Sequence, residues 1–137
     1  HSMVQFEDGA VIAQLGIPDM KLPISYAFSY PKRLHSKAPR LDFTQYATLT
    51  FEEPDMERFR NLAFAFDAVR KGGNMPCIVN AANEVVVAAF LHDEIGFLQM
   101  SDVIEKTMAK ATFIPVPTYE DYVATDAEAR KIAEKLI

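Results

Sequence analysis

The sequence of 137 residues has no tryptophan, five glycines and one cysteine. A single cysteine, Cys77, excludes a disulfide within the chain, so we expect a reducing, cytoplasmic environment. No apolar run is long enough to cross a membrane, and the first residues lack the pattern of a signal peptide, so we expect no membrane partner. Acidic residues outnumber basic residues by 19 to 14, and no concentrated basic surface is visible, which argues against nucleic-acid binding.

The common catalytic motifs are also missing. The sequence has no glycine-rich phosphate loop, no Cys or His cluster at metal-ligand spacing and no serine-centred nucleophile elbow. We interpret Lys71-Gly72-Gly73-Asn74 as a helix stop and Cys77 as a buried structural thiol. The amides and carboxylate of residues 80–84 (NAANE) are interpreted as helix caps or loop anchors rather than as a binding site.

What remains is a globular composition, in which half of the residues are hydrophobic and 24% are charged. Its clearest local pattern lies near the beginning. Asp8-Gly9 separates two extended runs, residues 3–7 and 10–15, and this predicts a hairpin closed by a two-residue turn, because both central residues can adopt a positive φ.

A sharp turn is expected directly after the second run, at Pro18-Asp19-Met20. Pro23 suits the first position of a short amphipathic helix over residues 23–30, since that position needs no amide donor. Met20 would then lie near the end of a strand, where α/β enzymes often place binding groups.

Residues 32–48 have no sustained periodicity and predict a connector. Residues 49–52 alternate like a short strand, which Pro54 would end. The basic residues of the connector form only a thin patch: Lys32, Arg33, Lys37 and Arg40.

From Asp55 the pattern becomes helical. Asp55 is expected to cap a first helix, Pro76 to open a second and Ser101 to cap a third. The apolar stripe expected to face the core from the first of these helices consists of Phe59, Leu62, Ala63, Phe66 and Val69.

The last helix is expected to begin at Thr125, which forms a capping-box pattern with Glu128. Thr118 and Asp121 predict only a short helical turn before it.

We therefore predict an α+β chain. Residues 1–30 are expected to form the hairpin and helix that close an α/β catalytic domain, residues 31–54 a linker, and residues 55–137 a bundle of three to four helices. The helices can bury their apolar faces against one another, whereas two strands alone are marginally stable. This asymmetry predicts that the first part needs packing partners from outside the sequence.

Residues 1–4 (HSMV) and 13–24 (AQLGIPDMKLPI) resemble the end of the catalytic domain in the 1-deoxy-D-xylulose 5-phosphate reductoisomerase family. The resemblance extends through the linker, a helix of the C-terminal bundle and the last helix, at residues 39–43 with 49–51, residues 80–84 with 88–91, and residues 126–130.

The resemblance implies an enzyme of non-mevalonate isoprenoid biosynthesis. Such enzymes convert 1-deoxy-D-xylulose 5-phosphate, a sugar phosphate, to 2-C-methyl-D-erythritol 4-phosphate with NADPH and a divalent cation, Mg or Mn, and are homodimers. The family's nucleotide loop, metal ligands and phosphate-binding residues precede the matched region. We therefore expect a C-terminal fragment with no catalytic, cofactor-binding or metal-binding residues of its own, which is inactive alone.

The resemblance places three residues at the substrate pocket, namely His1, Pro18 and Met20. His1 could donate a hydrogen bond to substrate, and Met20 could pack against substrate or the nicotinamide ring on a wall shaped by Pro18. The alternative is that His1 is solvated, Asp19 supports the turn and Met20 fills a gap. A rival for the whole chain is a non-enzymatic helical interaction module whose hairpin offers an edge for β-augmentation.

Overall fold

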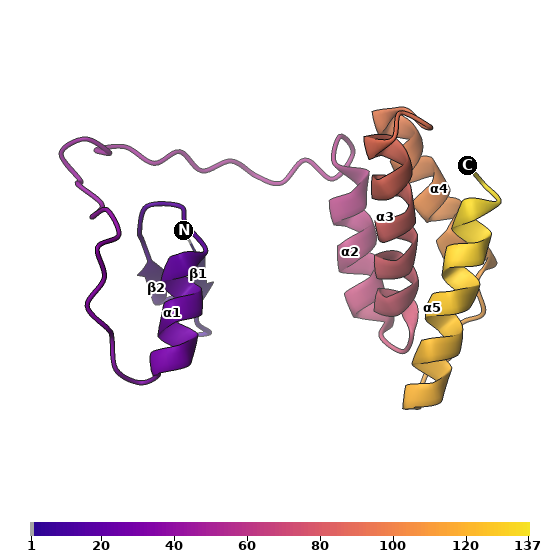
Figure 1. The fold of residues 1–137 in the computed structure, drawn as a ribbon, viewed down its shortest axis with the longest axis horizontal. Helices are drawn as coiled ribbons and strands as arrows, with labels where there is room; N and C mark the ends of the chain where they lie inside the picture. The colour runs from indigo at the N-terminus through magenta and orange to yellow at the C-terminus, as the bar shows by residue number, and fades with distance from the viewer. Residues whose placement is uncertain (1) are drawn as a thin grey trace. The chain divides into compact units, whose positions relative to one another are not determined.

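The computed structural model describes residues 2–137, and these fall into two compact units with the boundary between Glu52 and Glu53. The first unit contains two strands and one helix, and the second contains four helices (Figure 1). This confirms the predicted α+β class and the bundle of three to four helices. No helix or strand lies between the two sets of elements, in residues 30–59.

The strands of the first unit are β1 (Ser2–Gln5) and β2 (Val11–Gln14), which pair antiparallel with Val4 opposite Ile12. Both side chains remain exposed, at 58% for Val4 and 65% for Ile12. Met3, on the other face, is exposed as well. The hairpin therefore presents apolar side chains on both faces without burying either within the described residues.

The turn of the hairpin has three residues, so the predicted two-residue Asp-Gly turn is wrong. The Gly9 amide donates to the Phe6 carbonyl at 3.0 Å, and the Phe6 amide donates to the Ala10 carbonyl at 2.8 Å. Only Gly9 takes a positive φ, of 86°. Asp8 instead accepts a hydrogen bond from the Ala10 amide through Oδ1 at 2.9 Å, which is typical of a turn followed by a glycine bulge.

Helix α1 (Lys21–Ser29) begins two residues before the predicted Pro23. Asp19 explains this start, because its Oδ1 accepts a hydrogen bond from the Lys21 amide at 2.9 Å. The helix ends before Tyr30-Pro31, as expected for a residue that precedes proline.

The strand predicted at residues 49–52 is wrong, since β1 and β2 pair only with each other in the described sheet. Alternation of side chains indicates a strand only where a neighbouring strand supplies the hydrogen-bond ladder.

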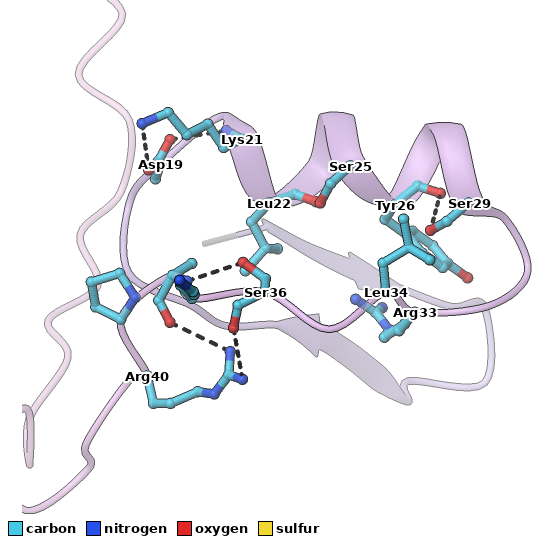
Figure 2. A pocket seen from close by; sticks show the side chains of 13 residues that line it. Asp19, Lys21, Leu22, Ser25, Tyr26, Ser29, Arg33, Leu34, Ser36 and Arg40 are labelled. Atoms are coloured by element: carbon cyan, nitrogen blue, oxygen red, sulfur yellow. Dashed lines mark hydrogen bonds and ion pairs between the residues drawn. The ribbon is translucent and has the colours of Figure 1, made fainter.

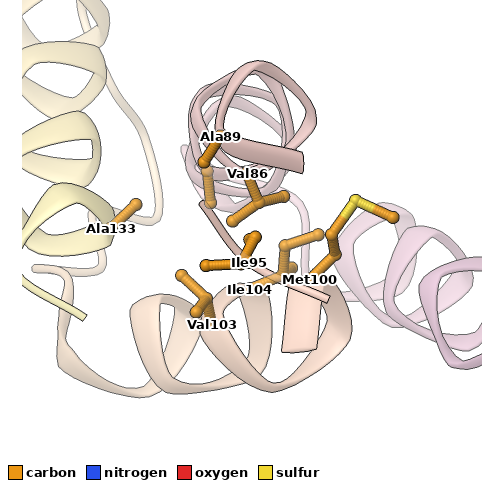
Figure 3. Close-up of a cluster of buried hydrophobic side chains, with 8 residues drawn as sticks. Val86, Ala89, Ile95, Met100, Val103, Ile104 and Ala133 are labelled. Carbon is orange, nitrogen blue, oxygen red and sulfur yellow. The ribbon is translucent and has the colours of Figure 1, made fainter. Parts of the chain in front are cut away.

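The second unit consists of α2 (Arg60–Lys71), α3 (Met75–Leu91), α4 (Phe97–Lys110) and α5 (Tyr119–Glu134). α3 lies at the centre and contacts each of the other three helices (Figure 1). The buried cluster drawn in Figure 3 joins α3, α4 and α5 and consists of Ala82, Val86, Ala89, Ile95, Met100, Val103, Ile104 and Ala133.

Two helix boundaries of the bundle, the end of α2 and the start of α3, follow the prediction. Gly72-Gly73 ends α2, and Pro76 lies in the first turn of α3. At Gly73 the φ angle is +56°, and a side chain there would collide with the Ile114 carbonyl oxygen. Only glycine satisfies both conditions.

The start of α4 differs from the prediction. Gly96 precedes its first turn, and Gln99 Oε1 accepts a hydrogen bond from the Gly96 amide at 2.6 Å. Ser101 therefore lies inside the helix, where its hydroxyl donates to Asn61 Oδ1 of α2 at 2.9 Å. Ser101 resembles a cap in sequence, but nothing in the preceding residues back to Gly96 interrupts the helix.

The start of α5 is also earlier than predicted. Thr118 Oγ1 accepts a hydrogen bond from the Asp121 amide at 3.2 Å, and Asp121 Oδ2 accepts one from the Thr118 amide at 2.9 Å. Thr125 is a buried residue of the same continuous helix and caps nothing. Of two overlapping capping motifs, the one after the proline-rich connector starts the helix.

The apolar stripe predicted to face the core from α2 is wrong as well. Ala68 is buried and Phe64 packs on the core cluster, whereas Phe66 is 45% and Val69 75% exposed. Asp55 does not cap α2. Its Oδ1 accepts a hydrogen bond from the Arg58 amide at 2.8 Å, in a turn that precedes the helix.

Candidate functional site

The turn between β2 and α1 encloses a hollow of about 470 Å³. Pro18 and Met20 line it together with Ser2 and Gln14 at the ends of the paired strands. Met20 is 69% exposed, so its thioether is available to a bound molecule. The structure thus brings two of the three predicted site residues together, while the third, His1, lies outside the residues it describes.

Asp19 stabilises this turn. In addition to its bond to the Lys21 amide, its carboxylate lies 3.9 Å from Lys21 Nζ. Both contacts are local, and they agree with the reading of Asp19 as a turn residue.

A second hollow, of about 650 Å³, lies between α1 and residues 33–40 (Figure 2). The Arg33 guanidinium stacks over the Tyr26 ring with 4.1 Å from Cζ to the ring centroid. Arg40 donates to the Ser36 carbonyl at 3.2 Å and to the Ala38 carbonyl at 3.5 Å. These two hollows share Asp19 and Leu22 at the start of α1, and the second, which extends along the helix to Ser29, is the one rich in cationic groups.

The family can be established independently of these hollows. A family model described as the DXP reductoisomerase C-terminal domain matches residues 15–132. The chain belongs to this family.

Relatives in the family match the chain from end to end. The 1-deoxy-D-xylulose 5-phosphate reductoisomerase of Bacteroides thetaiotaomicron is 73% identical over 137 residues, which are 100% of this chain and 35% of that protein. The reductoisomerase of Bacteroides fragilis is 70% identical over the same span, again 35% of its length. The chain therefore spans about a third of the length of these curated relatives.

Solved structures of the family have the same fold. A reductoisomerase from Zymomonas mobilis in complex with NADPH superposes with a TM-score of 0.88 at 45% identity, covering 99% of this chain and 36% of that one. A DOX-P reductoisomerase in complex with NADPH, fosmidomycin and magnesium gives a TM-score of 0.85 at 34% identity, with the same coverage. These relatives confirm the resemblance inferred from the sequence.

The described part of this family member offers no metal centre of its own. Among residues 2–137, no group of three or more His, Cys, Asp or Glu side chains is arranged to hold a metal ion. Within the same residues, no helix is both long and apolar enough to span a membrane.

The bundle contains a charged link that the sequence reading missed. Arg130 of α5 donates to Glu84 Oε2 at 2.6 Å and to Asp126 Oδ2 at 2.8 Å, and Asn80 donates to Glu84 Oε1 at 3.0 Å. The hydrogen bond from Arg130 is the main cause that lowers the pKa of Glu84. Glu84 therefore links α3 to α5, and residues 80–84 lie inside α3, so their interpretation as caps or loop anchors is wrong.

A second missed feature is Asn74, whose side chain is fully buried at the start of α3. Its Nδ2 donates to the Thr112 carbonyl and to Thr125 Oγ1, both at 2.9 Å, and its Oδ1 accepts from the Ile114 amide at 2.8 Å. The sequence gives no signal for this clamp, because its partners lie 38 to 51 residues away.

Cys77 is partly buried, and its Sγ lies 3.7 Å from the Tyr122 carbonyl oxygen. Burial raises the pKa of this thiol, which disfavours the thiolate that a nucleophile requires. A structural role is the reading that the contacts support.

Proposed function

We propose that the chain is the C-terminal part of an NADPH- and divalent-metal-dependent reductoisomerase. The enzyme would convert 1-deoxy-D-xylulose 5-phosphate to 2-C-methyl-D-erythritol 4-phosphate in isoprenoid biosynthesis. The observation that carries the proposal is the 73% identity, over all 137 residues, with a protein of that name.

The first unit is proposed to complete a larger catalytic domain. Its hairpin has apolar side chains exposed on both faces, as expected for strands that are covered by other parts of a longer protein. In that setting Pro18 and Met20 would form part of the substrate wall, where a flexible, apolar thioether suits contact with substrate or the nicotinamide ring. His1 is proposed for the same wall on the resemblance alone.

The second unit is proposed as a structural domain. We retain the assignment of residues 1–30 to the catalytic domain, 31–54 to the linker and 55–137 to the bundle. On the resemblance alone, we also retain the expectation that the chain supplies no catalytic, cofactor-binding or metal-binding residue. The whole enzyme is proposed to be a cytoplasmic homodimer.

The test is a chimera in which this chain replaces the matching C-terminal residues of the Bacteroides thetaiotaomicron relative. Purified chimera, the isolated chain and the N-terminal part of the relative are each incubated with substrate, NADPH and magnesium. We expect NADPH oxidation by the chimera and none by either part. A folded chimera without turnover, or turnover by the isolated chain, would overturn the proposal, and the first result would favour the interaction module.

A further inference from the structure

The hollow between α1 and residues 33–40 has an unbalanced positive charge. Four cationic side chains line it, against the single carboxylate of Asp19. These are Lys21, Arg33, Lys37 and Arg40. Of the four, only Lys21 has an acidic partner among the described residues, and that contact is long, at 3.9 Å. The hollow therefore lacks the anions that would neutralise it from within the described chain.

Two of the cationic groups are held in a fixed orientation by neutral partners. Arg33 stacks on the Tyr26 ring, and Arg40 is bound by the carbonyl oxygens of Ser36 and Ala38. Neither contact neutralises the charge, and both leave further N–H groups for a ligand, since a guanidinium has more donors than these contacts use. A guanidinium that is already oriented loses less conformational entropy when an anion binds.

Ser36 also lines the hollow and adds a hydroxyl group to it. Its Oγ accepts a hydrogen bond from the Ala38 amide at 3.0 Å, so its own proton can be donated to a ligand. Figure 2 shows Ser36 and Arg40 on the loop side of the hollow and Lys21 at the start of the helix. The Lys21 ammonium lies beside Asp19, so the hydrogen-bond donors of the loop side are those of Ser36 and Arg40.

We propose that this hollow binds a phosphate group, either of a small phosphate ester or as free phosphate. Planar guanidinium groups bind phosphate oxygens in pairs, and lysine adds a compact charge. Four cationic groups against one carboxylate suit a dianion better than a singly charged carboxylate. The volume of about 650 Å³ also suits a small organic ligand, with Leu22 and Leu34 available to its carbon atoms.

The proposal does not rest on the proposed function, because Pro18 and Met20 do not line this hollow. The phosphate-binding proposal can therefore fail while the proposed function stands, and the reverse is also true.

The test measures chemical modification residue by residue in the chimera described above. Lysines are acetylated and arginines are treated with phenylglyoxal, in phosphate and in chloride of equal ionic strength, and the rates are read by peptide mass spectrometry. We expect phosphate to slow the modification of Lys37, Arg33 and Arg40 several-fold. Lys32 is the matched control, because it lies in the same connector but does not line the hollow.

Two variants test whether the arginines contribute to the affinity for phosphate. Arg33→Gln and Arg40→Gln should each raise the phosphate concentration that protects Lys37 by about tenfold, and Lys32→Gln should not. Protection at lower concentration by glycerol 3-phosphate than by inorganic phosphate identifies an ester as the ligand, and equal protection identifies free phosphate. The proposal is overturned if neither inorganic phosphate nor glycerol 3-phosphate protects Lys37, or if Lys32 is protected as strongly as Lys37. It is also overturned if all the lining residues are unreactive in chloride, because another part of the longer protein would then cover the hollow.

Discussion

Asn74 is a fully buried amide in the second unit, and each polar group of its side chain has a hydrogen-bond partner. The contacts tie the start of α3 to the α4–α5 connector and to Thr125. A satisfied buried network of this kind stabilises one arrangement of the helices, and it becomes costly when one member is removed.

Replacing this amide should destabilise the bundle strongly. Asn74→Ala leaves the Thr112 carbonyl and the Ile114 amide without their partner, and we expect a loss of about 3 kcal/mol in the free energy of unfolding. Asn80→Ala is the control, because Asn80 is exposed on α3, which Asn74 precedes, and its loss should cost less than about 1 kcal/mol. Urea denaturation of both variants measures the difference, and equal losses would contradict the clamp.

The Glu84–Arg130 pair predicts a pH dependence. The pKa of Glu84 is lowered from its ordinary value of 4.5 by hydrogen bonds from Arg130 and Asn80. A lowered pKa in the folded state adds stability that is present above the unfolded pKa and is lost as the pH falls through the folded value.

The difference in unfolding free energy between the unaltered chain and Glu84→Gln should therefore be present at neutral pH and shrink below pH 4.5. It should also decrease with salt, because the pair is exposed. Glu94→Gln is the control, since Glu94 makes no ion pair among the described residues. A Glu84→Gln difference that does not change with pH would show that the pair does not couple to folding.

Met20 carries the residue-scale test of the proposed site. In the chimera, Met20→Ala should lower kcat/KM about tenfold, because the apolar contact with substrate or nicotinamide is lost. Met20→Leu keeps a similar volume and should retain most of the activity. An unchanged kcat/KM in Met20→Ala would show that Met20 fills a gap and does not contact substrate or nicotinamide.

At the scale of elements, α2 shows that a periodic apolar pattern does not decide which face of a helix packs on the core. The helix has two apolar stripes, and the sequence reading chose the one with more large residues, which is the exposed one. Phe64 and Ala68 face the core instead, and only the positions of the other helices decide this.

Two phenylalanines of α2 test this assignment directly. Phe64→Ala should lower the unfolding free energy of the bundle by about 3 kcal/mol, because Phe64 packs on the core cluster. Phe66→Ala, two positions along the same helix, should change it by less than about 1 kcal/mol. Chemical denaturation of the two variants compares them, and the reverse order would show that the predicted stripe faces the core.

Element boundaries were predictable where a residue type leaves the backbone few choices. Gly72-Gly73 ends a helix and Pro76 lies in the first turn of the next one, both in the prediction and in the structure. The errors at Ser101 and Thr125 arose from capping motifs, which occur inside helices as well as at their starts.

For the whole molecule, the two units differ in how much they bury. The bundle has a core that joins its helices, whereas none of the residues described in the first unit is buried. The sequence predicted this asymmetry, because a hairpin cannot bury two apolar faces alone. It also predicted that Pro18 and Met20 lie together, whereas the cationic hollow depends on a fold of residues 33–40 that no local pattern encodes.

Hydrogen exchange in the isolated chain and in the chimera tests the central claim most directly. We expect amides of α3 to be protected equally in both proteins, and amides of β1 and β2 to be protected only in the chimera, where the rest of the longer protein covers them. Strong protection of the hairpin in the isolated chain would contradict the account.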